Sequence, residues 1–572
     1  MSFFKRKNFI IFLVVILALD AVFAIILVLD QYFINITSFA QILPQDIVWY
    51  ASINIDSQSS QVQQLFKVLY KFPLADKIEK ALNNAWDQSI KEDLEDTPII
   101  KFPAFFEGSK EITVVQTDLD DFDMLLIADQ LDKKRKKNII DSLITDKSLE
   151  TKIERYKDKD IYLAKDFNIA ILDSFMVWAT KAEDIKKIID IYKDQELLSL
   201  NLFNKTKSLF SNKNYQKISQ NYNSQYLAAG YAANADINQK VSQVSSAFIN
   251  KVNLKAALLT PSTAISPAIS LAKDLMSYEV LWIDEDDLKF NSYVLDLKKD
   301  KKQMASFDIS QSLANLMPQQ INNRWIDFYE EGKDLNQAVE VLIQVWERIK
   351  QEMPKDDYGQ AIVSAVDKLP QLLNSYFNID LTEDLLPYAT NNFAFFAAPS
   401  FDNLPPEIGM VIQLNNAETV KENLKKIKTD PNAINLLSIS FEVKDDKLII
   451  SSSPDGVKSI IEGMADSSRQ KLAQNPDFQY QFKNLPASIQ GFSYGYTLGI
   501  WGIIKYFFNE ASVLEDLAVP YLKTVKTFGF YSFLKDGIQQ SYQTIHIEEV
   551  SQAEKEKAGE IFNNFFTKFN EN

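Results

Sequence analysis

The sequence contains no cysteine. Without thiols the chain can form no disulfide, no thiolate metal site and no cysteine nucleophile, and it cannot carry a lipid on an N-terminal cysteine. The absence does not fix a compartment, because an oxidising space permits disulfides without requiring them. The absence of cysteine therefore excludes thiol chemistry but does not indicate where in the cell the protein lies.

Histidine and glycine are also scarce. A single histidine, His546, excludes metal sites built from several histidines and leaves one residue for any histidine relay. The 14 glycines leave little room for a glycine-rich phosphate loop. We therefore expect no cofactor and assign no catalytic, cofactor-binding or metal-binding residue. The scarcity favours a non-enzymatic protein but leaves enzymes that use only carboxylates open.

The remaining composition is that of a folded protein. With 572 residues, 46% of them hydrophobic and 24% charged, the chain is long enough for two or more domains. Its net charge of −16 argues against nucleic acid as a partner, although residues 133–137 read "KKRKK". We interpret that run as a solvated helix face.

One long hydrophobic run occurs near the N-terminus. The 21 residues Phe9–Leu29 are interrupted only by Asp20, and 17 of them are Phe, Ile, Leu or Val. On the insertion scale those 17 contribute on the order of −5 to −10 kcal/mol, against roughly +2.5 to +3.5 kcal/mol for a central Asp. The balance favours insertion, so we predict a transmembrane signal anchor at residues 9–29.

The flanking charges predict the orientation of this anchor. Lys5, Arg6 and Lys7 precede the run, and the next basic residue is Lys67. By the positive-inside rule, residues 1–8 form a cytoplasmic tail and the rest lies outside the cell membrane. A cleavable signal peptide is the alternative, but its small-residue site at 22–24 sits inside continuing apolar sequence.

Asp20 has two interpretations. It could make an intramembrane contact, pairing with a polar group on another membrane helix or with its own copy in an oligomer. Alternatively, it is a tolerated, protonated residue in an otherwise strong span. The sequence leaves both open.

The exterior part begins with a juxtamembrane spacer at residues 30–42, within which Gln31–Gln41 is uncharged. The opening strand, "LPQDIVWYASINID", starts at Leu43 and alternates with period two. Its apolar face is Ile47, Trp49, Ala51, Ile53 and Ile55, which we expect to be the buried one. Further strands are expected at 111–117 and 122–128, with a helix over 131–145.

Two similar stretches indicate an internal repeat. "DSFMVWATKAEDIKKIID" begins at Asp173 and "DDKLIISSSPDGVKSIIE" at Asp445, 272 positions later. Other elements match in the same order, and Pro44 and Pro318 open the two copies. We predict a first unit at 43–300, a second at 301–549, and an amphipathic C-terminal helix at 550–572.

Each predicted unit mixes hairpins with helices and lacks regular βαβ alternation. This pattern favours an α+β fold with largely antiparallel sheets covered by amphipathic helices. The closing hairpin, "FGFYSFLKDGIQQSYQTIHIEE", carries Asp-Gly at its turn, which is a strong hairpin signal.

Several segments together resemble an uncharacterised bacterial family, the domain of unknown function 3352 family. They are the N-terminal anchor, "LPQDIVWYASINID", "FFEGSKEITVVQ", "MLLIADQLDKKRKKNIIDSL", "MVWATKAEDIKKII", "LIISSSPDGVKSII" and "LAQNPDFQYQF". The second copy departs from the pattern, since "ATNNFAFF" lacks a glycine at the equivalent of Gly108. The resemblance implies no activity and no catalytic residues.

Two further features could carry chemistry. His546 lies in "QTIHIEE" as an expected strand residue, and no nucleophile motif accompanies it. The acidic runs 118–123 and 284–287 do not match a Ca²⁺-binding loop, so we interpret them as solvated turns. Neither feature identifies a site.

Three functions remain in view. We expect a membrane-anchored, non-enzymatic binding or structural protein of the cell envelope, whose partner is another envelope protein, a cell-wall polymer or a surface. One alternative is a carrier or chaperone for a lipid or other apolar ligand. The other is a hydrolase that uses two carboxylates, which a pair converging in a cleft would support.

Overall fold

The structure is a computed structural model. It describes residues 39–56, 58–73, 109–117, 124–129, 133–145, 149–165, 167–173, 175–198, 208–219, 226–232, 275–296, 305–335, 339, 381–399, 405–425, 440–507 and 515–560. The expected anchor at Phe9–Leu29 and Asp20 within it lie outside these ranges. Within them, no helix combines the length and apolar character needed to span a bilayer.

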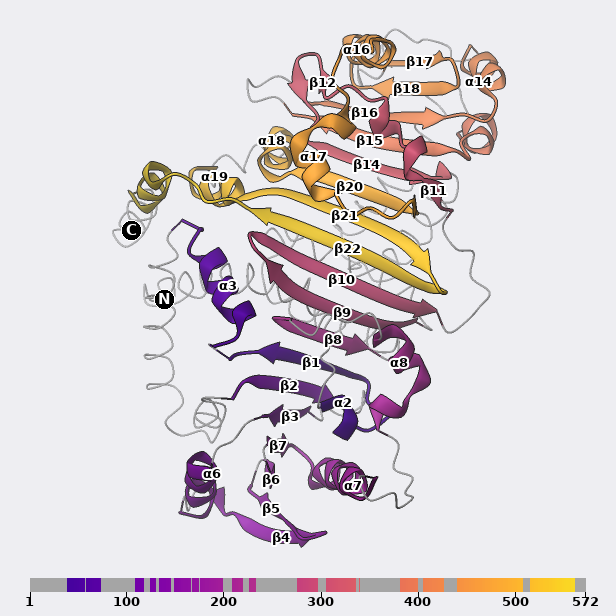
Figure 1. The fold of residues 1–572 in the computed structure, drawn as a ribbon. Coiled ribbons are helices and arrows are strands. Elements are labelled where there is room, and N and C mark those ends of the chain that lie inside the picture. Colours follow the sequence, from indigo (N-terminus) through magenta and orange to yellow (C-terminus); the bar gives the residue numbers. More distant parts are fainter. Residues whose placement is uncertain are drawn as a thin grey trace, which may run out of the picture. The chain divides into compact units, whose positions relative to one another are not determined.

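The described residues form two compact units, of which the first takes in those within Met1–Lys299 together with Gly537–Gln539. Its core is an antiparallel sheet, coloured indigo to magenta in Figure 1. In order of hydrogen-bonded neighbours the strands are β4 (Lys152–Tyr156), β5 (Lys159–Leu163), β6 (Asn168–Leu172), β7 (Phe175–Ala179), β3 (Met124–Ala128), β2 (Glu111–Gln116), β1 (Trp49–Asn54), β8 (Ala228–Ala232), β9 (Leu275–Asp284) and β10 (Asp287–Asp296).

The second unit lies within the chain that follows and is also built on antiparallel strands. In order they are β17 (Ser440–Lys444), β18 (Lys447–Ser451), β16 (Glu407–Gln413), β15 (Asn392–Ala398), β14 (Phe328–Lys333), β20 (Gly491–Tyr496) and β21 (Val525–Lys535). β22 (Ile538–Ile547) follows β21 after a tight turn. Two short pairs, β11 (Phe307–Asp308) with β19 (Ser488–Ile489) and β12 (Gln320–Ile321) with β13 (Arg324–Trp325), complete the strands of the described part.

The central strands of the two units are connected in a similar order, although the first unit has two further strands, β4 and β5, beside its hairpin. In each, one strand (β1 or β14) lies between the next strand along the chain (β2 or β15) and a much later one (β8 or β20). The following strand (β3 or β16) pairs with the second strand of a hairpin, β6–β7 or β17–β18. A bridge also precedes each central strand, joining Pro44 to Ser208 and Pro318 to Lys471.

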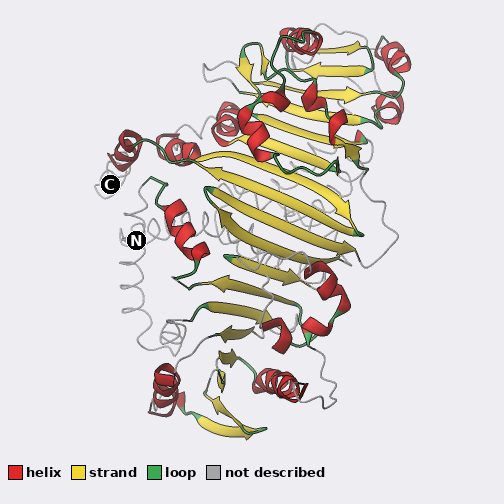
Figure 2. Cartoon of the chain, viewed as in Figure 1, coloured by secondary structure: helices red, strands yellow, loops and turns green. Residues whose placement is uncertain are grey.

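Helices lie between and beside the strands, as Figure 2 shows in red. In the first unit they are α2 (Phe39–Ile42), α3 (Ser60–Leu69), α6 (Lys133–Thr145), α7 (Ala182–Leu198), η3 (Leu209–Ser211) and α8 (Lys213–Ser219). In the second they are η4 (Ile309–Gln311), η5 (Leu313–Asn315), η6 (Leu381–Leu385), η7 (Leu386–Tyr388), α14 (Ala417–Leu424), α16 (Pro454–Ala465), η8 (Leu472–Gln474), α17 (Pro476–Gln481), α18 (Thr497–Phe507) and α19 (Glu515–Thr524). A helix also runs over 552–560.

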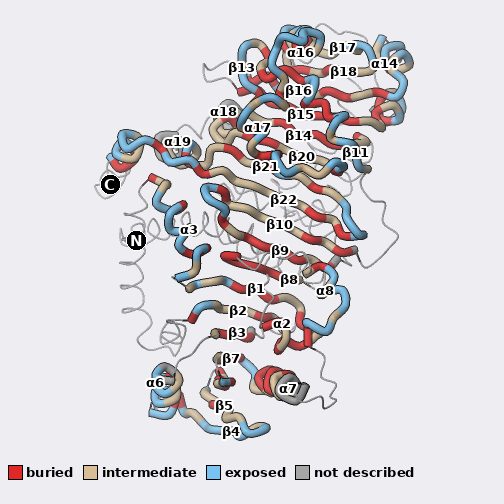
Figure 3. Tube along the Cα trace, in the orientation of Figure 1, coloured by how far each residue is buried: buried red, intermediate tan, exposed pale blue. Residues whose placement is uncertain are grey.

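The core of each unit is centred on a pair of tyrosines. Tyr50 of β1 is paired in register with Tyr231 of β8, and Tyr329 of β14 with Tyr494 of β20. All four side chains are at most 2% exposed, and Figure 3 shows buried residues running along these central strands. The predicted α+β class with large antiparallel sheets is confirmed.

Several hairpins turn without glycine. Asp173, between β6 and β7, has φ 44°, and Asp445, between β17 and β18, has φ 55°. Aspartate tolerates the left-handed region because its short side chain can bond locally. The predicted Asp-Gly turn also forms, with φ 54° at Asp536 and 71° at Gly537. Aspartate thus supplies turns in a chain that has few glycines.

Ile47, just before β1, is buried as predicted, but within β1 the opposite face from the predicted one is buried. Tyr50 and Ser52 are buried, whereas Ile53 is 42% exposed. The polar atoms are satisfied inside, since the Tyr50 hydroxyl lies 2.7 Å from that of Tyr215 and the Ser52 hydroxyl donates to Glu111. A polar group that is hydrogen-bonded can be buried at little cost. The alternation of apolar residues along a strand cannot predict which polar side chains find such a partner.

The second copy opens differently from the first, in the stretch that follows Pro318. "MPQQINNRWIDFY" does not form one strand, because Asn322 (φ 52°) and Asn323 (φ 62°) make the turn between β12 and β13. The strand equivalent to β1 is β14, which starts at Phe328. Asparagine, like aspartate, adopts positive φ readily, and the pair acts as a turn signal.

Candidate functional site: carboxylates bound by hydroxyl and amide donors

Three glutamates on the sheets collect unusually many hydrogen bonds: Glu111 in the first unit, and Glu331 and Glu407 in the second. Glu331 is 1% exposed and Glu407 is 4% exposed. A carboxylate removed from water requires donors, because its desolvation is otherwise very costly. The identity of those donors decides whether each group is available for chemistry.

Glu111 begins β2 and is surrounded by hydroxyl groups. The Ser52 hydroxyl donates to its Oε1 at 2.8 Å, and the Tyr226 hydroxyl donates to its Oε2 at 3.0 Å. Thr113 donates a longer bond of 3.4 Å to Oε1, and its hydroxyl also contacts that of Ser52. Both carboxylate oxygens are therefore occupied by side chains of the same unit.

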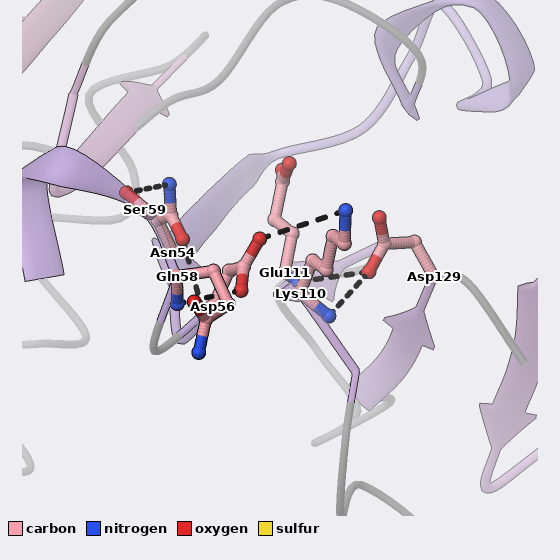
Figure 4. Close-up of polar contacts among 7 residues, drawn as sticks. All are labelled: Asn54, Asp56, Gln58, Ser59, Lys110, Glu111 and Asp129. Carbon is pink, nitrogen blue, oxygen red and sulfur yellow. Dashed lines mark hydrogen bonds and ion pairs between the residues drawn. The ribbon is translucent and has the colours of Figure 1, made fainter.

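Asp129, just after β3, binds the start of β2. Its Oδ1 accepts bonds from the backbone amides of Lys110 at 2.9 Å and Glu111 at 2.8 Å. Burial raises the pKa of Asp129 from its usual value, although these bonds oppose the shift. Figure 4 shows how Asn54, the last residue of β1, and Asp56, just after it, lie beside this group, with the Asp56 carboxylate 3.6 Å from the Lys110 ammonium. The cluster ties together the ends of three neighbouring strands.

Glu331 on β14 joins the sheet to the short helix η5. Its Oε2 accepts from the hydroxyls of Ser312 at 2.6 Å and Tyr329 at 2.7 Å, and its Oε1 accepts from the Leu313 amide at 2.7 Å. Longer bonds of 3.3 Å come from the Ala314 amide and the Asn392 side chain. Burial raises the pKa of Glu331, while these donors pull it back down.

Glu407 begins β16 and faces the start of α16. The hydroxyls of Ser451 (2.6 Å), Ser452 (3.0 Å) and Ser453 (2.8 Å) donate to it, and the Asn322 amide adds a bond of 3.1 Å. Ser453 in turn caps the helix by accepting from the Gly456 amide at 2.9 Å. The serines of "LIISSSPDG" therefore serve the first turn of the helix.

A hydroxyl beside a carboxylate is also the arrangement of an activated nucleophile. Here Ser52 is 0% exposed and Ser451 is 1% exposed, so neither hydroxyl meets a substrate in solution. Within the described ranges, no three carboxylate or histidine side chains are grouped to hold a metal ion. We conclude that these clusters fasten strands and helix starts to one another.

The structure separates the residues that the sequence offered as candidates. His546 lies on β22 with its ring centroid 4.8 Å from that of Tyr480. Asp284–Asp287 form the β9–β10 turn, where Lys289 contacts Asp284. Lys133–Lys137 open α6, with Lys134 exposed. Asp20 and the run 118–123 lie outside the described residues.

Sequence reasoning missed all three glutamates. "FYEEGK" contains the available signal for Glu331, because two acidic residues in a strand beside a core tyrosine place one of them inside. The hydrogen-bond donors to Glu111, Ser52 and Tyr226, are 59 and 115 positions away along the chain, so no local sequence pattern predicts them.

The fold is α+β, and its most hydrogen-bonded carboxylates lie on the sheets. The chain belongs to the protein family of unknown function DUF3352, whose model matches residues 109–433. A comparison with curated proteins gave no match. Among solved structures, crystal form III of TP0453 aligns at 9% identity, covering 46% of this chain and 81% of that one, with a TM-score of 0.24. Crystal form I aligns at 11% identity over 47% and 81%, with the same score.

Proposed function

We propose that this protein is a membrane-anchored, extracytoplasmic binding or structural protein without enzymatic activity. The anchoring is supported by the apolar run Phe9–Leu29. Its orientation is supported by Lys5, Arg6 and Lys7, which precede the run, since the next basic residue is Lys67. The anchor holds the described units outside the cell membrane, where their surfaces meet envelope partners.

The state of the carboxylates supports a non-enzymatic role. Catalytic acids and bases need a free position toward a substrate. Glu111, Glu331 and Glu407 instead direct their oxygens to serine, tyrosine and amide donors of their own unit. These bonds account for the burial of the carboxyl groups without invoking a reaction.

We also propose that the two units arose by duplication of one α+β module. The similar order of the central strands supports this, and so do the matched bridges at Pro44 and Pro318. A further detail agrees: the Leu209 amide donates to the Leu43 carbonyl at 2.8 Å, and the Leu472 amide donates to that of Met317 at 2.8 Å. A doubled module provides two surfaces that can diverge.

Membrane extraction tests the anchoring. After an alkaline carbonate wash, the full chain should stay in the membrane pellet. A variant with Val14→Lys, Leu17→Lys and Val22→Lys should move to the supernatant, because three charges abolish the apolar span. A wild-type chain released by carbonate would contradict the proposal.

Capture of binding partners tests the function itself. Crosslinking the chain in intact cells and identifying its adducts by mass spectrometry should return envelope proteins or wall fragments. Co-purification of stoichiometric lipid from a detergent-free preparation would instead favour an apolar-ligand carrier. Turnover of an ester or glycoside panel that is lost in Glu111→Gln or Glu407→Gln would overturn the non-enzymatic assignment.

A further inference from the structure

One turn of the first unit presents an aromatic ring to solvent on a rigid support. Phe210, in η3, is 41% exposed, while its neighbour Leu209 is fully buried. The Phe210 carbonyl accepts a 2.8 Å bond from the Gln216 side chain of α8. Asn212 fixes the intervening residues by accepting from the Asn214 amide at 2.9 Å. The exposed ring therefore belongs to an ordered turn.

Two exposed lysines follow this ring in the chain, on the helix α8. Lys213 and Lys217 lie on α8, one turn apart, and both are exposed, whereas Tyr215 and Ile218 on the other face are buried. The result is a small surface, Phe210 with Lys213 and Lys217, that is basic and aromatic on a chain whose net charge is −16. Aromatic and basic side chains together are typical of surfaces that rest on anionic lipid.

The equivalent turn of the second unit lacks all three residues. Leu472 corresponds to Leu209 through its bond to Met317, and Asn475 caps α17 as Asn212 caps α8. Counting from these fixed points, Ala473 replaces Phe210, Pro476 replaces Lys213 and Tyr480 replaces Lys217. The same scaffold thus carries the aromatic and basic surface in one unit and not in the other.

The unit that carries it is the one next to the membrane anchor. The predicted span ends at Leu29, and the described chain resumes at Phe39, which is 2% exposed in the core of the first unit. Nine residues separate them, which extend at most about 30 Å. Phe39 opens α2, and α2 packs directly against η3. The turn that exposes Phe210 is therefore beside the point where the tether enters the unit.

We propose that Phe210, Lys213 and Lys217 dock the first unit onto the anionic phospholipid surface of the membrane that holds the anchor. This inference rests on the proposed anchoring. Phe210 enters the interfacial layer and the lysines pair with lipid phosphates. Because the tether supplies a high local concentration, a small contact suffices to hold the unit in one orientation. α3 and the residue that follows it also expose Phe66, Leu69 and Tyr70. α3 packs on β9, whereas α2, which the tether enters, packs on η3.

The absence of cysteine makes a direct test available. Asn214→Cys places a single thiol among the docking residues, and Gln479→Cys places one on the exposed side of α17 as the matched control. Each full-length chain is labelled with an environment-sensitive fluorophore in nanodiscs of phosphatidylglycerol and phosphatidylcholine, or of phosphatidylcholine alone. Quenching by aqueous iodide and by lipids with a shallow spin label reports the position of the probe.

In anionic nanodiscs the probe at 214 should be at least threefold less quenched by iodide than the probe at 479, and should be quenched by the spin-labelled lipid. Adding Phe210→Ala, the residue present in the second unit, or Lys213→Glu with Lys217→Glu should remove the difference, as should uncharged nanodiscs. Equal iodide quenching at 214 and 479 in anionic nanodiscs overturns docking. Chains that fail to co-elute with the nanodiscs overturn the anchoring, which separates the two failures.

Discussion

Each unit places a hydrogen-bonded carboxylate beside its central strand, but the two units supply that carboxylate from different strands. In register, Ser52 of β1 corresponds to Glu331 of β14, since each lies two residues after the central tyrosine. Glu111 of β2 corresponds to Asn392 of β15 by the same alignment. The first unit bonds Ser52 to Glu111, and the second bonds Asn392 to Glu331. The position requires a carboxylate with a donor, and either strand can supply it.

The difference has a consequence for the helix beside the sheet. From β14, Glu331 reaches the amides of Leu313 and Ala314 in η5. Glu111 instead bonds hydroxyls, including that of Tyr226. The second unit therefore depends on its carboxylate for a helix start as well as for strand pairing. The comparison predicts unequal losses when each carboxylate is removed.

The largest expected effect is that of Glu331→Ala. It leaves two backbone amides and the hydroxyls of Ser312 and Tyr329 without their acceptor, which should destabilise the second unit by about 3–5 kcal/mol. Glu111→Ala should cost the first unit less, about 2–3 kcal/mol. Hydrogen exchange with mass spectrometry should show faster exchange at Leu313 and Ala314 in the first variant only. Equal losses in both variants would count against the assigned roles.

The next effect depends on pH. Asp327 stands where the first unit has Val48, and burial raises its pKa to about 7. The folded state therefore favours the protonated acid, and its contribution to stability is complete below the unfolded pKa of 3.8 and lost as pH rises through about 7. Asp327→Asn should raise the free energy of unfolding at pH 8 by on the order of 1–3 kcal/mol and change it little near pH 4.

Urea titrations at several pH values check this prediction. Asp445→Asn, at an exposed turn, controls for the removal of one negative charge. A gain for Asp327→Asn that does not grow with pH would refute a buried acid at this position.

A smaller loss of stability is expected from the hydrogen bond of the central tyrosine, because Tyr50 and Tyr329 have different partners. The Tyr50 hydroxyl lies 2.7 Å from that of Tyr215, whereas the second unit has Phe478 at the equivalent place and Tyr329 donates to Glu331. Tyr215→Phe should cost about 1 kcal/mol, the net worth of one buried hydrogen bond. Denaturant unfolding followed by exchange in the first unit measures it, and a loss above about 3 kcal/mol would show that the ring itself is misplaced.

The smallest effect concerns the hairpin turns. Asp445→Gly should stabilise the second unit by roughly 0.5 kcal/mol, because glycine adopts positive φ without steric cost. Asp173→Gly should not, since the Asp173 carboxylate accepts from Lys159 at 3.0 Å and from the Tyr192 hydroxyl. Thermal unfolding of both variants compares them, and stabilisation of equal size in both would show that the contacts of Asp173 contribute nothing.

How far the sequence predicts the fold depends on the range of the signals. Predictions from local sequence signals are confirmed. They are the Asp-Gly turn at Asp536, the acidic β9–β10 turn and the strand that begins at Glu111. The buried face of β1 could not be read, because Tyr50 is buried through a contact with Tyr215, 165 positions away. The clusters around Glu111 and Glu331 depend on strand register, which one sequence does not reveal.

The most direct test of the account is the side of the membrane on which the N-terminus and the second unit lie. Ser2→Cys and Gln479→Cys provide single thiols in a chain that has none. In spheroplasts, a membrane-impermeant maleimide should modify the thiol at 479 at once and the thiol at 2 only after the membrane is permeabilised. Modification at 2 in intact spheroplasts, with protection at 479, would contradict the account.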